Sequence, residues 1–149
     1  MKDLKNILVA VDFNDVVGDL MGYAESLAEK FDAKLWLVHV TAPSPDNIGP
    51  EPAPQYLRDF KAEELKDEHR NLQNLCDIFL DKSIAVDALL IIGSTVETVL
   101  EEAEKLNCDL LITGTHKHGF FHNLLSENVS LDLFKKSRIP LLTIPIDEE

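Results

Sequence analysis

Five short apolar runs alternate along this chain with four longer segments in which apolar residues recur at helical spacing. The runs are rich in Val, Ile and Leu with little polar interruption, which is typical of strands buried on both faces of a sheet. They occupy residues 7–11, 34–41, 84–92, 109–113 and 140–145. The helical segments lie between them, at about 16–31, 55–80, 94–107 and 123–136.

Each of the first three helical segments carries an apolar stripe at a spacing of three or four residues, which places side chains on one face of a helix. We expect the stripes to face the sheet and the charged residues of the second segment, Lys61 and Glu68 among them, to face solvent. The predicted stripes are Leu20, Ala24, Leu27, Ala28 and Phe31, then Leu57, Phe60, Leu65, Leu72, Leu75 and Phe79, and then Val96, Val99, Leu100, Ala103 and Leu106.

The alternation of strand and helix predicts an α/β fold, doubly wound, in which a five-stranded parallel sheet carries helices on both faces. No internal repeat or boundary interrupts it, so residues 1–149 are predicted to form one domain. Five prolines between residues 43 and 54 predict a surface loop. The last of them, Pro54, fits the first turn of the second helix. Ser94 and Glu97 have the spacing of a capping box at the start of the third helix.

Composition and charge limit the partners. The formal net charge of −13 argues against nucleic acid and anionic membranes. No apolar stretch is long enough to cross a bilayer, and the N-terminal residues lack a signal-peptide layout. Cys76 and Cys108 have no metal-ligand or C-x-x-C spacing. We therefore expect buried free thiols and a cytoplasmic location.

Polar residues follow three of the predicted strands at the edge where ligands bind in sheets of this kind. Asp12 follows the first strand, a loop after Thr41 follows the second, and Gly114 follows the fourth. Asp12 is placed either to accept a hydrogen bond from a base or ribose or to cap the next helix. Beyond Gly114 a polar loop leads into a helix, which is the arrangement of a phosphate-binding loop.

These segments together resemble the universal stress protein family over nearly the whole chain. The resemblance rests on the first strand with Asp12, on Leu37-Val38-His39-Val40, on Gly93-Ser94-Thr95, and on the segments 109–116 and 137–145. It implies an adenine nucleotide alpha hydrolase-like fold with strand order 3-2-1-4-5 and an adenine-contacting role for Asp12. The nucleotide-binding residues that it implies, if that site is retained, are Ala10, Asp12, Val40, Thr113, Gly114, Lys117, Asn128 and Val129.

The loop departs from the motif of nucleotide-binding members, in which G-x-x-G is followed after nine residues by G and then S or T. Gly114 falls on the first glycine, but Lys117, Glu127 and Asn128 fall on the other three positions. Glycine there keeps a Cβ away from phosphate oxygens. A carboxylate at about 4 Å from a phosphate opposes it by roughly 4 kcal/mol near a protein surface. We therefore expect no tight ATP binding and name no certain cofactor; AMP or adenosine suits the less altered adenine end better than ATP does.

Two further features of this loop have competing interpretations. His116, His118 and His122 lie close together, but spacing is the only support for a metal site and no cysteine completes a ligand set. We predict no metal there. Phe120 and Phe121 form either an exposed interaction patch or packing beneath the loop.

The sequence favours a stress-response binding or signalling module over an enzyme, because no nucleophile–base pair is visible at the strand ends. The alternatives are an ATP- or AMP-binding family member with slow phosphohydrolase activity, and a ligand-free structural partner protein. A homodimer is also predicted, because the last short strand lies at a sheet edge in the implied topology. In that dimer Leu142 and Ile144 should meet their symmetry mates. The contact is predicted to run through Leu141, Leu142, Thr143 and Ile144.

Overall fold

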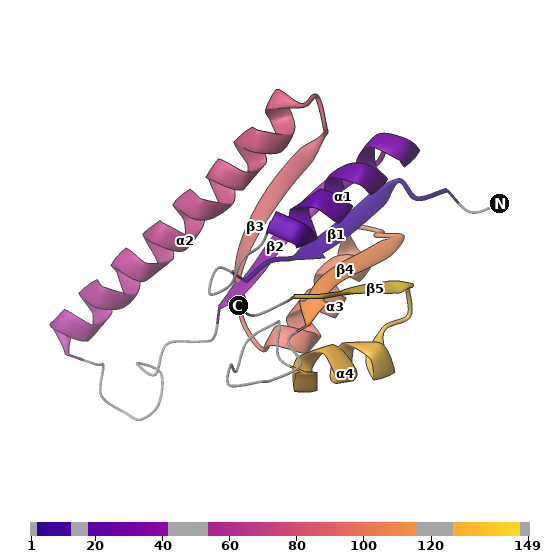
Figure 1. Cartoon of the computed structure of the whole chain (residues 1–149). Coiled ribbons are helices and arrows are strands. Elements are labelled where there is room, and N and C mark those ends of the chain that lie inside the picture. The colour runs from indigo at the N-terminus through magenta and orange to yellow at the C-terminus, as the bar shows by residue number, and fades with distance from the viewer. Residues whose placement is uncertain (1–2, 13–17, 42–53, 116–126, 147–149) are drawn as a thin grey trace.

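The computed structural model describes residues 3–12, 18–41, 54–115 and 127–146, without the side chains of Leu57, Glu127 and Asn128. Strands and helices alternate throughout these ranges (Figure 1). The strands are β1 (Asn6–Ala10), β2 (Lys34–Thr41), β3 (Val86–Ile92), β4 (Leu110–Thr115) and β5 (Leu141–Pro145). The helices are α1 (Gly18–Phe31), α2 (Gln55–Asp81), α3 (Thr95–Lys105) and α4 (Glu127–Lys136).

The strands form one parallel sheet in the order β3-β2-β1-β4-β5, which confirms the predicted fold class. β1 is central, with Ile7 opposite Leu35 of β2 on one side and opposite Leu110 of β4 on the other. β3 and β5 are the edge strands. Strand order therefore reverses between β1 and β4, where the following helices change faces.

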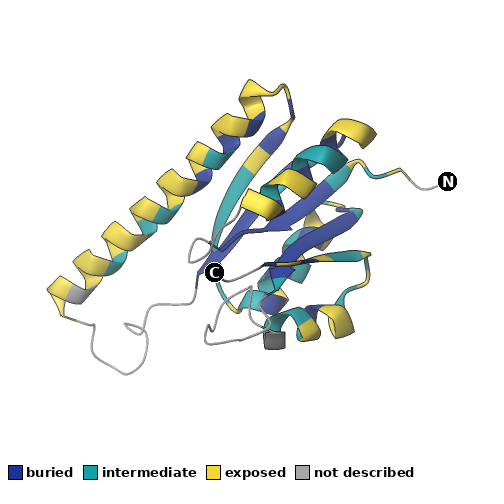
Figure 2. Cartoon of the chain, in the orientation of Figure 1, coloured by how far each residue is buried: buried dark blue, intermediate teal, exposed yellow. Residues whose placement is uncertain are grey.

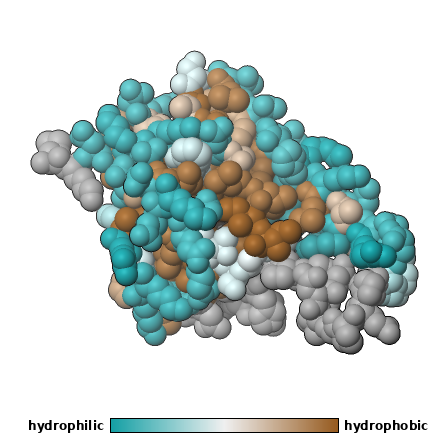
Figure 3. Space-filling view, turned by 180° about the vertical axis from the view of Figure 1, so that it is seen from behind, coloured by the Kyte–Doolittle hydropathy of each residue, from teal (hydrophilic) through white to brown (hydrophobic). Residues whose placement is uncertain are grey.

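Two apolar clusters, one on each face of the sheet, form the core. Ile7 and Val9 point from β1 toward α1 and α2, whereas Leu8 and Ala10 point toward α3 and α4. All four are fully buried, as is most of the centre of the sheet (Figure 2). The face of α3 and α4 is covered less completely: Figure 3 shows apolar side chains exposed on the back of the molecule.

Helix α2 extends beyond the sheet, so part of its predicted stripe is wrong. At 27 residues it is about 40 Å long, whereas the seven residues of β3 span about 23 Å. Leu72 and Phe79 are buried, but Phe60 is 71% exposed. Figure 2 shows that the part of α2 extending beyond the sheet is mostly exposed. Phe31, the last residue of α1, is likewise 43% exposed because α1 ends there. The α3 stripe is confirmed, with Val96, Val99 and Ala103 buried.

Local details differ from expectation at three element ends. Ser94 is the N-cap of α3, but its exposed side chain makes no capping hydrogen bond, so the predicted capping box is not formed. Pro54 is the N-cap of α2 and does not lie in its first turn. β4 continues past Thr113 through Gly114 and Thr115, because these residues pair with Ile144 and Pro145 of β5. Gly114 is therefore a strand residue and not the first residue of a loop.

Three turns at the amino edge of the sheet share one design. Asp32, Ser83 and Asn107 have left-handed φ angles of 52°, 63° and 53°, and each follows a helix and precedes a strand. In each turn the next residue donates its N–H to a carbonyl five residues back, at 2.9 to 3.0 Å. This is the Schellman arrangement, which satisfies carbonyls at the end of a helix.

Candidate functional site

The residues implied by the sequence meet at the carboxyl edge of β1, β2 and β4. Asp12 lies two residues after the end of β1 and is 2% exposed. On either side of it, Val40 of β2 is 7% exposed and Thr113 of β4 is fully buried. Ala10 and Gly114 are buried as well. The fold thus brings five of the eight implied residues to one edge, next to the reversal of strand order.

The other three implied residues belong to the segment after β4. Lys117 lies outside the described residues, and so do His116, His118, His122, Phe120 and Phe121. Asn128 lies in the first turn of α4, but its side chain is not described. Val129 is partly buried against the α3 and α4 face. The role of these three residues in a ligand site stays a prediction.

The start of α4 is attached to the end of β4 by a hydroxyl group. Ser130 Oγ lies 3.4 Å from the Gly114 carbonyl oxygen and donates to it. The N-terminal part of α4 is thereby held beside the carboxyl edge of the sheet. N–H groups and the positive end of the helix dipole favour anions at such a position.

Asp12 is held through the residue before it. The Val11 N–H donates to the Val38 carbonyl over 2.8 Å, which extends the pairing of β1 with β2 past Ala10. The Val11 carbonyl accepts a hydrogen bond from His39 Nδ1 at 2.7 Å. Both polar backbone groups of Val11 are therefore bonded to β2, and they fix the position at which Asp12 leaves the sheet.

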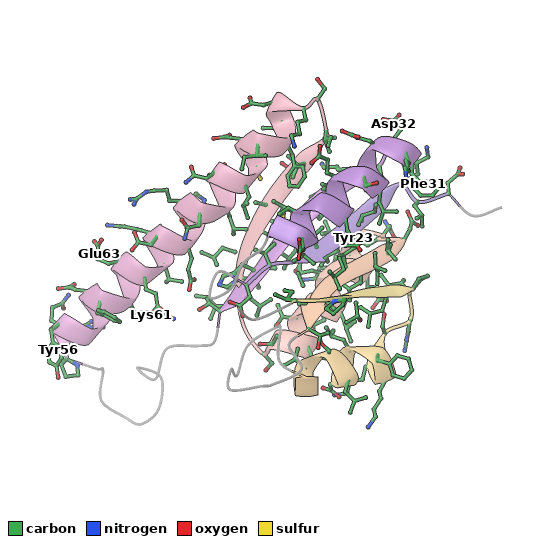
Figure 4. All side chains as sticks on the ribbon, viewed as in Figure 1. Tyr23, Phe31, Asp32, Tyr56, Lys61 and Glu63 are labelled. Atoms are coloured by element: carbon green, nitrogen blue, oxygen red, sulfur yellow. The ribbon has the colours of Figure 1, made fainter. Side chains whose placement is uncertain are left out.

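Charged residues of α2 lie beside this edge of the sheet, although the sequence predicted that they would face solvent. Lys61 Nζ lies 3.3 Å from Thr41 Oγ1 at the end of β2 and 3.6 Å from Glu64 Oε2. Glu68 Oε1 lies 3.5 Å from His39 Nε2. In Figure 4 Lys61 points to the side of α2 that faces the sheet, and Glu63 points away from it. Their spacing could have predicted this orientation, because Lys61 and Glu68 are two helical turns apart on the same side of α2 as Leu65 and Leu72.

The two thiols are unsuited to nucleophilic chemistry. Cys76 and Cys108 are buried and free, as predicted. Burial, aided by the charge of Asp109, raises the pKa of Cys108 to about 12. Burial also raises the pKa of Cys76, with smaller contributions from Asp87 and Asp77. Since the thiolate is the reactive form, both groups stay protonated and inert near neutral pH.

The described ranges hold neither a cluster suited to a metal ion nor a helix suited to crossing a membrane. Within them, no group of three or more His, Cys, Asp or Glu side chains is arranged to hold a metal ion. No helix among these residues has both the length and the apolar character needed to cross a bilayer.

The fold and the edge residues together define a doubly wound α/β protein whose ligands would bind where strand order reverses. The sequence model of the universal stress protein family matches residues 3–145. The chain therefore belongs to that family. Its curated relatives include universal stress protein A homolog 1 of Coxiella burnetii, 29% identical over 85% of this chain and 86% of the relative. Universal stress protein MJ0531 of Methanocaldococcus jannaschii is 21% identical over 94% and 81%.

Solved structures share the adenine nucleotide alpha hydrolase-like fold. Hypothetical protein MJ0577 has a TM-score of 0.80 and 19% identity, covering 98% of this chain and 99% of that one. A universal stress protein in complex with cAMP has a TM-score of 0.68 at 17% identity, over 98% and 100%. A family protein from Arabidopsis thaliana with AMP bound has a TM-score of 0.67 at 16% identity, over 96% and 92%.

Proposed function

We propose that this protein is a cytoplasmic binding and signalling module that takes adenosine or AMP at the carboxyl edge of its sheet and does not bind ATP tightly. The observation that carries the proposal is Asp12, a carboxylate only 2% exposed and flanked by buried apolar residues of β1 and β2. A carboxylate accepts hydrogen bonds from amino and hydroxyl groups, which a nucleoside offers. Family proteins with the same fold bind AMP and cAMP.

The phosphate end is where this chain departs from a triphosphate site. Lys117 and Glu127 stand where glycines would let the backbone approach β- and γ-phosphates. A single phosphate needs less of that cradle and can use the N-terminal part of α4, which Ser130 holds beside Gly114. The phosphohydrolase alternative requires the missing cradle, so we favour a module without catalytic activity.

Titration calorimetry tests the proposal. We expect saturable binding of AMP, no saturable binding of ATP with Mg²⁺ at micromolar concentrations, and no release of phosphate from ATP. Asp12→Asn should weaken AMP binding, whereas Asp81→Asn, which changes an exposed carboxyl group on α2, should not. A submicromolar dissociation constant for ATP would contradict the proposal, and so would AMP affinity unchanged by Asp12→Asn.

Repair of the loop provides a matched test. The triple change Lys117→Gly, Glu127→Gly and Asn128→Ser restores the family's motif after Gly114. It should strengthen ATP binding measurably, because Cβ atoms and a carboxylate are removed from the expected phosphate position. A folded triple variant with no gain in ATP affinity would show that the loop positions are not what limits binding.

We further propose a homodimer through the outer edge of β5. β5 is an edge strand, and Pro140 and Pro145 restrict pairing to the residues between them. Ile144 is 3% exposed and packs in its own core, so it is not placed to meet its symmetry mate as expected. The backbone groups, the half-buried Leu141 and Leu142 and the exposed Thr143 are available to a partner.

Light scattering at micromolar concentration tests this contact. A twofold antiparallel contact places the two Thr143 side chains near each other, and Thr143→Lys sets like charges together. We expect a dimer that dissociates in this variant and is retained in Thr143→Val. A wild-type monomer, or a dimer that survives Thr143→Lys, would refute the contact.

A further inference from the structure

We propose that His39 and Glu68 are positioning residues for Asp12: the pair shares a proton and couples the docking of α2 to the carboxylate at the end of β1. The inference deepens the proposed nucleotide site and rests on it for its binding measurements. The partners come from three separate parts of the fold, which are β2, α2 and the residues that follow β1.

His39 is the central member of this connection. It lies on β2, is 8% exposed, and directs its two ring nitrogens toward different oxygen atoms. Nδ1 lies 2.7 Å from the Val11 carbonyl oxygen, and Nε2 lies 3.5 Å from Glu68 Oε1. A carbonyl can only accept, so Nδ1 carries a hydrogen and donates it. The imidazole thus bonds the peptide that joins Val11 to Asp12.

The second ring nitrogen requires an additional proton. A neutral imidazole has one N–H, and that hydrogen is used by the Val11 carbonyl. Nε2 would then direct a lone pair at a carboxylate oxygen, which is repulsive. A proton between Nε2 and Glu68 Oε1 removes the repulsion, whether it resides on the ring or on the carboxyl group. The geometry is therefore complete only when the pair holds that shared proton.

Glu68 depends on this partner because it is largely removed from water. Its side chain is 17% exposed, and among the described residues no donor reaches its buried Oε2 atom. Desolvation makes a buried carboxylate costly unless it is paired. Glu68 therefore gains by keeping α2 against His39, and His39 in turn keeps its bond to the Val11 carbonyl.

Among the described residues, the other charged groups near the pair are engaged elsewhere or belong to the site itself. On α2, Lys61 contacts Thr41 Oγ1 and Glu64. After β1 comes Asp12, the carboxylate that is positioned. On β3, Asp87 forms a 2.7 Å ion pair with Lys34, and the strand presents Ala88 and Leu90 to the face on which α2 packs.

Two substitutions of Glu68 separate positioning from simple packing. Glu68→Leu removes the shared proton and should weaken AMP binding about tenfold, the value of one hydrogen bond to a charged group. Glu68→Gln keeps a donor, because its amide N–H can bond a neutral Nε2 without any shared proton. The Gln variant should therefore bind AMP about as tightly as the wild type does. Glu63→Gln, on the exposed side of α2, is the control and should behave as wild type.

The experiment combines calorimetry with AMP and NMR of the ¹⁵N-labelled protein without ligand. NMR should show a hydrogen on His39 Nδ1, and faster exchange of the Asp12 amide in Glu68→Leu than in Glu68→Gln. If the wild type binds no AMP, the proposed function fails, and the NMR result alone decides the positioning role. Equal losses of AMP affinity in Glu68→Leu and Glu68→Gln, or an Asp12 amide unaffected by Glu68→Leu, would overturn the inference.

Discussion

The buried thiol of Cys108 should make the stability of this protein fall at alkaline pH. Burial raises its pKa from 9.0 to about 12, with the charge of Asp109 adding to the effect. In the unfolded chain the thiol ionises near its ordinary pKa, whereas in the folded protein it stays protonated. Because the pKa of Cys108 is higher in the folded state, the contribution of this thiol to stability is complete below pH 9.0 and is lost as the pH rises toward 12.

The magnitude follows from the two pKa values. At about pH 8 the unfolded thiol is mostly protonated, and ionisation costs almost nothing. At about pH 10, one unit above the ordinary value, ionisation of the unfolded chain lowers the free energy of unfolding by about 1 kcal/mol. Cys76 also has a raised pKa, so Cys76→Ala is the background in which the effect of Cys108 is isolated.

Urea unfolding at these two pH values measures the loss. The Cys76→Ala protein should lose about 1 kcal/mol more between them than the Cys76→Ala/Cys108→Ala double variant. Tyr and Lys side chains titrate in both proteins, so their contributions cancel in the difference. Native-state alkylation at about pH 8, read by mass spectrometry, should leave Cys108 unmodified while a small free thiol reacts. Equal losses in the two variants, or rapid labelling of Cys108 in the folded protein, would refute this reasoning.

Two further predictions concern stability and are measured by urea unfolding. Phe79→Ala should lower the free energy of unfolding by about 4 kcal/mol, because Phe79 is 2% exposed. Phe60→Ala, on the part of the same helix that extends beyond the sheet, should change it by less than about 0.5 kcal/mol. Similar costs for the two substitutions would show that this part of the helix is packed in solution. Gly93→Ala should cost about 1–2 kcal/mol, since its Cβ would lie 2.4 Å from Thr98 Oγ1. Thr98→Ala should recover most of that loss, and strictly additive effects of the two changes would contradict the clash.

The sheet could be predicted from the sequence because both the apolar composition of its strands and the spacing of apolar residues in its helices are visible there. Ile7 to Val11 is an uninterrupted apolar run, and its burial follows from that alone. The α3 stripe was predictable for the same reason. Phe60 shows the limit, because its spacing fits the α2 stripe while the helix extends past the sheet that would cover it. The length of an element relative to its neighbour is a property of the fold and not of local periodicity.

The candidate site was predictable where it lies on strand ends and unpredictable where it depends on pairing. Asp12 was identified because strand ends converge in a parallel sheet, whereas Thr113 was implied only by the family resemblance. Gly114 was expected to begin a loop, but hydrogen bonding to β5, which no local pattern shows, extends the strand. Glu68 was assigned to solvent by residue type, although its place between Leu65 and Leu72 indicated a partly covered face. The proton that it shares with His39 depends on contact across two elements.

The three left-handed turns at Asp32, Ser83 and Asn107 stabilise the fold at a distance from the proposed ligand site. All three lie at the amino edge of the sheet, and Asp12, Thr113 and Gly114 lie at the opposite, carboxyl edge. Glycine relieves backbone strain at a left-handed position, at the cost of a more flexible unfolded chain. The amino edge is therefore a region in which sequence can drift or be engineered for stability while the ligand edge stays unchanged. Selection on binding and selection on stability would act on this chain at opposite ends of the same strands.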